Sequence, residues 1–443
     1  MKKALFIAYY YPPYGGGGVQ RTTKYVKYLR AYGWEPVVLT IDEDKIPLRD
    51  ESLLKDVPKD QEILRTNIWS LERISKLLPR RKAAPVSEQA VASSFLKRLV
   101  RKALKGIFLL GYTFVFYPDD KIGWYPYAVR KGKERMAAGD IDLIYTTSAP
   151  FTAHLIGLSL KKSTGKPWVA DLRDPWAGNK YLPFSRLRQP LDRMVEGFCI
   201  HHADKVITVS EPLREELAHT YPQQDSDKFL VISNGYDEDD LVPELRAEMS
   251  QGDRPLTMTF SYTGSFYNKI SPRYFLKAMD ELLREGKLRD QDVRIQFTGQ
   301  FGVESMQLIT AFRTAHSGVI EVSGYVPHLE ATERMLAADV LLLILNKDAR
   351  RGVLTGKIFE YLGSGKPVLA LIPEGLASEL LLSEKAAVVI DPDDQAGIKR
   401  GIMEYYRRWQ SGRLTSTTDR EIAGQYSRKE LAGRLARVFD ALT

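Results

Sequence analysis

The order of apolar and polar positions along the chain predicts an α/β protein built from parallel strands. Short apolar runs at 4–9, 141–146, 168–172 and 340–345 alternate with stretches of helical periodicity. Runs without polar alternation are typical of strands buried on both faces of a parallel sheet. Such strands need a helical crossover between them, which the intervening segments can supply.

The length of the chain predicts two domains, because 443 residues exceed one ordinary hydrophobic core. We place the first Rossmann-like domain at residues 1–240 and the second at 241–415, with a separate C-terminal helix in 416–443. No regular alternation is visible over about 66–140, so we interpret that stretch as a basic insertion within the first domain.

The segment 340–372 shows the clearest βαβ pattern. Val340–Leu345 and Val368–Ile372 read as buried strands, and a short helix is expected to begin near Lys357. In such units ligands bind outside the carboxyl ends of the strands. The loop before this helix is therefore a candidate binding site.

The residues at this helix start suit a phosphate beside hydroxyl groups. Thr355 can cap the helix, and the free N–H groups from Gly356 onward favour an anion. Lys357 adds a positive charge, and Glu360 places a carboxylate one turn later. A phosphate next to a hydroxyl-binding carboxylate is the arrangement that a nucleotide-sugar requires.

The same segment resembles the donor-binding element of family 4 glycosyltransferases. Their paired glutamates precede a Gly-x-Pro-Val strand, which here reads Gly365-Lys366-Pro367-Val368. Glu360 matches the second glutamate, which in the family binds the ribose hydroxyls. The first glutamate of the family contacts the donor sugar, and Gly352 stands in its place here. The resemblance implies the GT-B fold, two Rossmann-like doubly wound domains facing across a cleft, with the terminal helix crossing back onto the first.

Four glycines at 15–18 follow the first predicted strand and precede a helix. Glycines there let the backbone approach a ligand closely, although a flexible turn would explain them as well. The segment also resembles the opening loop of the family, which lies between acceptor and donor phosphates. This resemblance implies site roles for Gly16, Gly17 and Arg21.

A second anion site is predicted at the start of the second domain. Gly264 follows a strand, and Lys269 and Arg273 stand close to a helix N-terminus. The family has a glycine and two basic residues here that grip the nucleotide diphosphate. By the same resemblance, the backbone at Tyr325 and Val326 faces the base.

A polar cluster at the end of the strand Trp168–Leu172 supplies the catalytic candidates, Asp171, Arg173 and Asp174. An internal salt bridge from Arg173 to either aspartate is the structural alternative. The resemblance puts Arg173 and Asp174 where the family has a His-Asp pair. His154, in the first turn of a predicted helix, is interpreted as structural.

The net charge of +8 is concentrated in residues 73–105, where ten basic residues face one acidic residue. From about 94 to 117 this stretch reads as a basic amphipathic helix followed by an apolar run, which favours an anionic membrane surface. The alternative is a helix packed on its own domain with a solvated basic face. The apolar run is shorter than the roughly 20 residues that span a bilayer. No nucleic-acid-binding signature accompanies the charge, so nucleic acid is not expected as a partner.

The cellular location follows from the cysteine content and the first residues. A single cysteine, Cys199, indicates a reducing compartment, and the apolar start reads as a strand rather than a signal peptide. We therefore expect a cytoplasmic protein. If it binds a membrane, we expect a peripheral position on the inner face of the cytoplasmic membrane.

The predicted function is transfer of a sugar from a nucleotide-diphosphate sugar to a glycan or polyprenyl-linked acceptor, in synthesis of cell-surface polysaccharide or glycoconjugate. The resemblance implies retention of configuration, with no cofactor and no required metal. Asp42-x-Asp44 has the form of a metal motif from another transferase architecture, but a solvated loop explains it better. The alternatives are a GT-B-like nucleotide-sugar epimerase and a non-catalytic protein that binds nucleotide-sugar or lipid.

Overall fold

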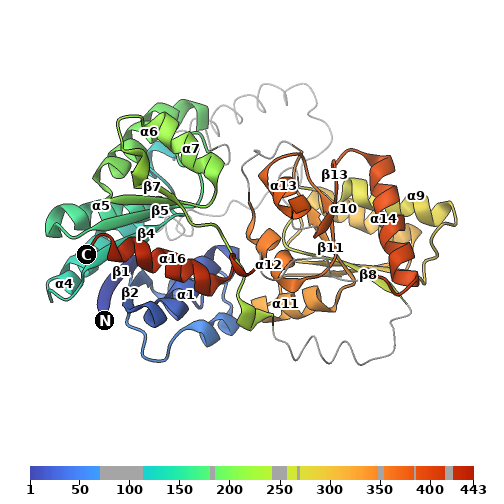
Figure 1. Ribbon diagram of the computed structural model, residues 1–443, viewed down its shortest axis with the longest axis horizontal. Helices are drawn as coiled ribbons and strands as arrows, with labels where there is room; N and C mark the ends of the chain where they lie inside the picture. The colour runs from blue at the N-terminus through green and yellow to red at the C-terminus, as the bar shows by residue number, and fades with distance from the viewer. Residues whose placement is uncertain are drawn as a thin grey trace, which may run out of the picture.

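The computed structural model describes residues 1–69, 113–179, 185–241, 257–266, 270–347, 354–383, 386–414 and 423–443. It contains two parallel sheets that lie side by side, each with helices on its faces (Figure 1). The predicted fold class, two Rossmann-like doubly wound domains, is confirmed.

The first sheet has seven strands in the order β3-β2-β1-β4-β5-β6-β7, all paired in parallel. The strands are β1 (Lys2–Ile7), β2 (Trp34–Ile41), β3 (Ile63–Thr66), β4 (Leu143–Thr147), β5 (Trp168–Leu172), β6 (Lys205–Thr208) and β7 (Phe229–Val231). The helices are α1 (Gly17–Leu29), α4 (Tyr125–Met136), α5 (Thr152–Thr164), α6 (Ser185–His202) and α7 (Glu211–Thr220). The central strands are buried on both faces, because their side chains are apolar at nearly every position.

The second sheet has six strands and repeats this order as β10-β9-β8-β11-β12-β13. The strands are β8 (Met258–Thr263), β9 (Val293–Thr298), β10 (Ile320–Ser323), β11 (Val340–Ile344), β12 (Val368–Leu371) and β13 (Ala387–Ile390). The helices are α9 (Arg273–Arg284), α10 (Val303–Ala315), α11 (His328–Ala337), α12 (Gly356–Ser364), α13 (Leu376–Ser383) and α14 (Gln395–Gln410). In both sheets the strand order reverses beside the first strand, where doubly wound folds bind their ligands.

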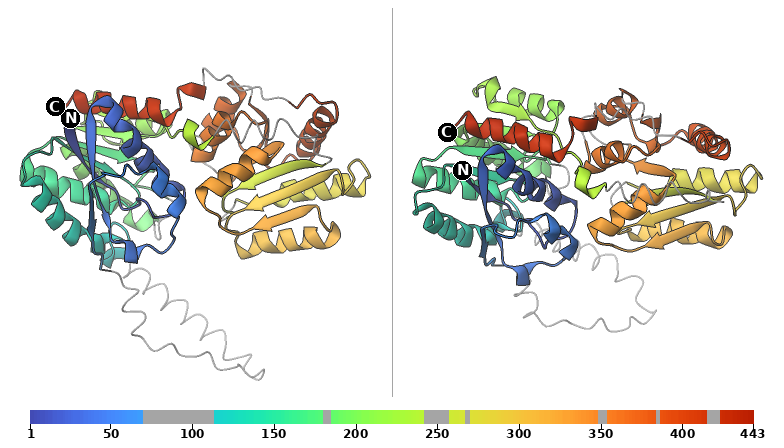
Figure 2. Two further views of the ribbon diagram at one scale, coloured as in Figure 1. Left: turned by 90° about the horizontal axis from the view of Figure 1, so that it is seen from below. Right: turned by 60° about the horizontal axis from the view of Figure 1, so that its bottom comes forward.

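The last helix, α16 (Arg428–Asp440), lies on the first domain, although it follows the second in sequence (Figures 1 and 2). Its apolar side buries Leu431, Leu435 and Phe439 in one core with Phe6 and Tyr145. The chain therefore crosses between the domains twice. The two crossings run side by side, since Tyr236 and Ser427 form a parallel bridge.

The stretch that we interpreted as an insertion contains part of the first domain itself. Helix α4 falls within it and packs against α5, and β3 ends at its first residue. Most of the predicted membrane segment, 94–112, lies outside the described residues. Among the residues that are described, no helix has both the length and the apolar character needed to cross a bilayer.

Candidate functional site

The carboxyl edge of the second sheet brings Gly264 and Lys357 together. Gly264 follows β8 with a φ of +144°, and a Cβ atom there would lie 1.9 Å from Nζ of Lys357. That ammonium group lies 3.2 Å from the hydroxyl of Tyr262 and 4.3 Å from the centroid of its ring. The positive φ favours glycine at 264, and a larger residue would also displace the end of the lysine side chain.

Lys357 forms no ion pair within the described part of the chain. Burial lowers the pKa of its ammonium group to about 8, and the nearby charge of Glu360 acts in the opposite direction. The group is therefore a cation at neutral pH with no acidic partner in the described part of the chain. It lies beside the first turn of α12, whose free amide groups also favour an anion.

Three buried threonine hydroxyls near this edge have no hydrogen-bond partner among the described residues. Thr263 and Thr298 face each other across the ends of β8 and β9, and Thr355 occupies the N-cap position of α12. The predicted helix cap is therefore right in position, but the predicted hydrogen bond is wrong, because the Thr355 side chain makes no capping hydrogen bond. Unsatisfied buried hydroxyls are costly, so their position indicates a polar ligand.

The other predicted donor-site residues are Arg273, Lys269 and Glu360, of which the structure describes Arg273 and Glu360. Arg273 begins α9, but its exposed guanidinium pairs with Glu304 at 2.7 Å. Lys269 lies outside the described residues. Glu360 is half-buried on α12 and lines a pocket between the domains.

The glycine loop lies against the second domain. A Cβ atom at Gly15 would come 2.5 Å from the hydroxyl of Tyr325. Gly16 has a φ of +99° at the N-cap of α1, and an added Cβ at Gly16 or Gly17 would meet no atom within 4 Å. Val326, next to Tyr325, is half-exposed. The loop and the residues predicted to face the base thus lie against each other where the two domains meet.

Arg21 and Asp171 pair with each other in the interior of the first domain. The guanidinium donates to the carboxylate at 2.8 and 3.1 Å, and Tyr145 donates to the same carboxylate at 2.6 Å. Both side chains are fully buried. Burial opposes ionisation of Asp171, but the charge and hydrogen bond of Arg21 lower the pKa of that carboxyl. An internal salt bridge from Arg173 was the structural alternative for this cluster. Asp171 does form an internal salt bridge, but its cation is Arg21, so the predicted cation was wrong.

Arg173 and Asp174 lie closer to the surface than Asp171. Arg173 donates to the carbonyl of Gly18 at 2.8 Å and also to that of Ser148, so it joins the end of β5 to the glycine loop. Asp174 is exposed. Of the three catalytic candidates, these two are therefore the ones that solvent reaches.

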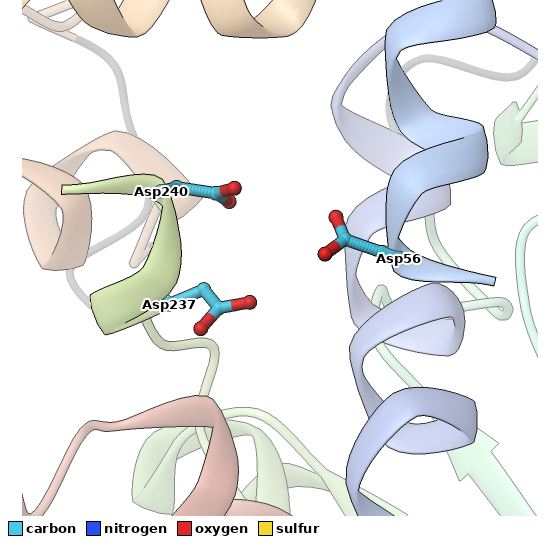
Figure 3. Close-up of side chains that lie close together, drawn as sticks. All are labelled: Asp56, Asp237 and Asp240. Carbon is cyan, nitrogen blue, oxygen red and sulfur yellow. The ribbon is translucent and has the colours of Figure 1, made fainter. Parts of the chain in front are cut away.

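A cluster that the sequence did not reveal joins α1 to the interdomain linker. The carboxylates of Asp56, Asp237 and Asp240 face one another across a small gap (Figure 3). Nζ of Lys24 lies 2.6, 2.6 and 2.8 Å from them, so an ammonium group takes the place that a metal ion would occupy. The acidic run from Asp237 to Asp240 was its one sequence signal.

Comparison with known proteins supports the resemblance. Residues 97–240 match the family model described as Glycosyltransferase Family 4. A comparison with curated proteins gives no match.

Solved structures with the same architecture cover the whole chain. Sucrose-phosphate synthase from Thermosynechococcus elongatus is 15% identical with a TM-score of 0.65, over 100% of this chain and 99% of its own. Anabaena Alr3699/HepE in complex with UDP-glucose is 13% identical with a TM-score of 0.62, over 100% of both chains. UDP-GlcNAc 2-epimerase from Methanocaldococcus jannaschii is 11% identical with a TM-score of 0.54, again over 100% of both chains. At these identities the likeness establishes the GT-B fold, and the function has to be argued from the site.

Proposed function

We propose that the protein is a glycosyltransferase that moves a sugar from a nucleotide-diphosphate sugar to a hydroxyl group of a glycan or polyprenyl-linked acceptor. The observation that carries the proposal is the ammonium of Lys357, which lies over Gly264 beside the first turn of α12 and has no acidic partner among the described residues. A lysine, free helix amides and unsatisfied hydroxyls at one strand edge suit a diphosphate. The match to Glycosyltransferase Family 4 and the UDP-glucose complex of a protein with the same fold support this donor class.

The proposed reaction places the donor on the second domain and the acceptor on the first. The acceptor oxygen forms a bond to the anomeric carbon, and the bond from that carbon to the diphosphate breaks with its electron pair on phosphate oxygen. The hydroxyl proton passes to that departing oxygen, on the same face of the sugar, so configuration is retained. Lys357 and the α12 amides stabilise the charge that develops on the diphosphate.

An epimerase is the second candidate, because UDP-GlcNAc 2-epimerases share the fold. The two functions differ in their need for an acceptor. An epimerase would convert its nucleotide-sugar with no acceptor present, whereas a transferase would release the nucleoside diphosphate in proportion to the acceptor that is glycosylated. The match of residues 97–240 to the transferase family favours transfer.

The acceptor class and the location rest on the basic segment. Its sequence at 94–117 favours attachment to anionic lipid, which would bring the cytoplasmic enzyme to polyprenyl-linked acceptors on the inner membrane face and to polysaccharide synthesis. Flotation with anionic vesicles tests this, with Lys97, Arg98 and Arg101 changed to Glu. Equal flotation of variant and wild type would reject the membrane role.

The transferase proposal is tested by incubating the protein with UDP-, GDP- and ADP-sugars and a polyprenyl-linked glycan extract. We expect glycosylated product with one donor, and a loss of about a hundredfold or more in Lys357→Ala. Lys277→Ala is the matched control, since Lys277 is exposed on α9 and its ammonium lies 4.0 Å from Glu281. Conversion of donor without acceptor would favour the epimerase instead.

A further inference from the structure

Arg428 is a buried arginine with no acidic partner in the part of the chain that the structure describes. It is the first residue of α16, and its backbone N–H donates to the carbonyl of Tyr236 at 2.8 Å. The residue is 5% exposed, and Nη1 of its guanidinium is buried without a hydrogen-bond partner in the described structure. No carboxylate of the described chain lies within ion-pair distance of it.

A buried guanidinium without an acidic partner destabilises the fold, and this distinguishes Arg428 from the other buried cations nearby. Arg21 has Asp171, and Lys24 has three aspartates, so both charges are compensated. Burial, aided by the positive charge of Arg21, lowers the pKa of Arg428 to about 10, so the group is still charged at neutral pH. A buried charge without a partner destabilises a fold by several kcal/mol in general, so its presence calls for a reason outside stability.

The surroundings of Arg428 supply that reason. Arg428 lines the pocket between the domains together with Glu360, Gln20 and His328. Each comes from a different helix, α16, α12, α1 and α11, so the pocket is complete only when both domains are in place. Glu360 has no ion-pair partner in the described chain, so the pocket offers a free acceptor and a free donor.

A vicinal diol satisfies such a pair, because one hydroxyl can donate to the carboxylate while the other accepts from the guanidinium. The ribose of a nucleotide carries this diol. His328 begins α11 directly after the loop of Tyr325 and Val326, so the pocket adjoins the predicted base site. We propose that Arg428 is a donor-binding residue that acts with Glu360 on the ribose hydroxyls of the nucleotide. This inference rests on the proposed function.

A ligand-binding arginine and a structural arginine respond differently when their charge is removed. Replacing Arg428 by Met removes the uncompensated charge but keeps the length of the side chain and the backbone hydrogen bond to Tyr236. The free protein should therefore unfold at the same or a higher temperature. Its affinity for nucleotide should fall about tenfold or more, as expected for a lost hydrogen bond to a charged group.

The experiment measures thermal unfolding and the affinity for UDP, GDP and ADP by calorimetry in wild type, Arg428→Met and Arg428→Lys. The tightest nucleotide is then compared with its 2′-deoxy and 3′-deoxy forms. Wild type should prefer the intact ribose, and Arg428→Met should bind intact and deoxy forms nearly equally. Arg428→Lys, which keeps the charge, should recover part of the preference. Arg437→Met is the control and should match wild type, because Arg437 is exposed further along α16 and pairs with Glu430.

The role of Arg428 and the proposed glycosyltransferase function can fail separately in this experiment. If wild type binds none of the three nucleotides, the proposed function fails. If wild type binds and Arg428→Met keeps the full preference for ribose, or unfolds at a markedly lower temperature with unchanged binding, Arg428 is structural and the inference is wrong.

Discussion

The guanidinium of Arg21 and the carboxylate of Asp171 form a fully buried ion pair at 2.8 Å that joins α1 to the end of β5. The remaining guanidinium N–H groups donate to the carbonyls of Ile232 and Ser233, which follow β7. The pair thus connects three elements of the first domain beneath the glycine loop.

We expect Asp171→Asn to destabilise the protein strongly, because Arg21 would keep its buried charge and lose its partner. The loss should be about 3–5 kcal/mol in the free energy of unfolding, measured with urea. The exposed neighbour gives the control, since Asp174→Asn should stay within about 0.5 kcal/mol of wild type. Wild-type stability combined with loss of transfer would instead make Asp171 a catalytic group.

Asp50 connects the two domains and gives a second prediction. One carboxylate oxygen accepts from the backbone N–H and hydroxyl of Ser52, and the other accepts from the backbone N–H of His328 at 2.8 Å and from Tyr325 at 3.3 Å. Asp50→Ala should loosen the closed arrangement, increase the radius of gyration in X-ray scattering and raise KM for the donor several-fold. Ser52→Ala removes only the local contact and should change neither quantity. Unchanged scattering in Asp50→Ala would show that the domains are held by other contacts.

Lys357 predicts the pH dependence of donor use. Its pKa in the free protein is about 8, lowered by burial, so the ammonium is charged below that pH and neutral above it. Because the neutral amine cannot hold the diphosphate, kcat/KM for the donor should fall as pH rises through about 8. Lys357→Arg keeps the charge, so its activity, although lower, should lack this alkaline limb. If kcat/KM fell in the same way above pH 8 in both proteins, the fall would come from a group other than Lys357.

His154 predicts sensitivity to acid. Burial lowers the pKa of its imidazole to about 3, and Nδ1 contacts the hydroxyl of Thr146 at 2.8 Å. In the unfolded chain the group takes up a proton near pH 6.5, whereas the folded protein does so only near pH 3. Unfolding is therefore favoured progressively as pH falls from 6.5 toward 3. His154→Gln should lose less stability than wild type over this range in denaturant titrations. Parallel losses would show that other groups dominate, and His219→Gln, exposed on α7, controls for the change of residue type.

The sequence predicted the two sheets because uninterrupted apolar runs are a local signal. The run 340–345 became β11 and 168–172 became β5, within a residue of the expected ends. Helix α11 was missed, since only Thr332, Met335 and Leu336 of its residues are buried and the apolar stripe is short. Helix α4 was hidden in a stretch read as an insertion, because only one of its three buried residues, Met136, has a large apolar side chain; the others are Ala128 and Gly132.

The site was predictable where its residues are close in sequence. Thr355, Gly356 and Lys357 share one helix start, and local rules place them at an anion site. Partners far apart in the chain give no such signal. Arg21 and Asp171 are 150 residues apart, and Arg428 reaches the pocket of Glu360 only because α16 returns to the first domain.

The central claim, that a nucleotide-sugar binds with its diphosphate at Gly264 and Lys357, is tested most directly by a crystal structure of the protein soaked with the donor that it turns over. We predict diphosphate density within hydrogen-bond distance of Lys357 Nζ and the first amides of α12, with the ribose beside Glu360. Density for the nucleotide at any other place, with this strand edge empty, would contradict the account.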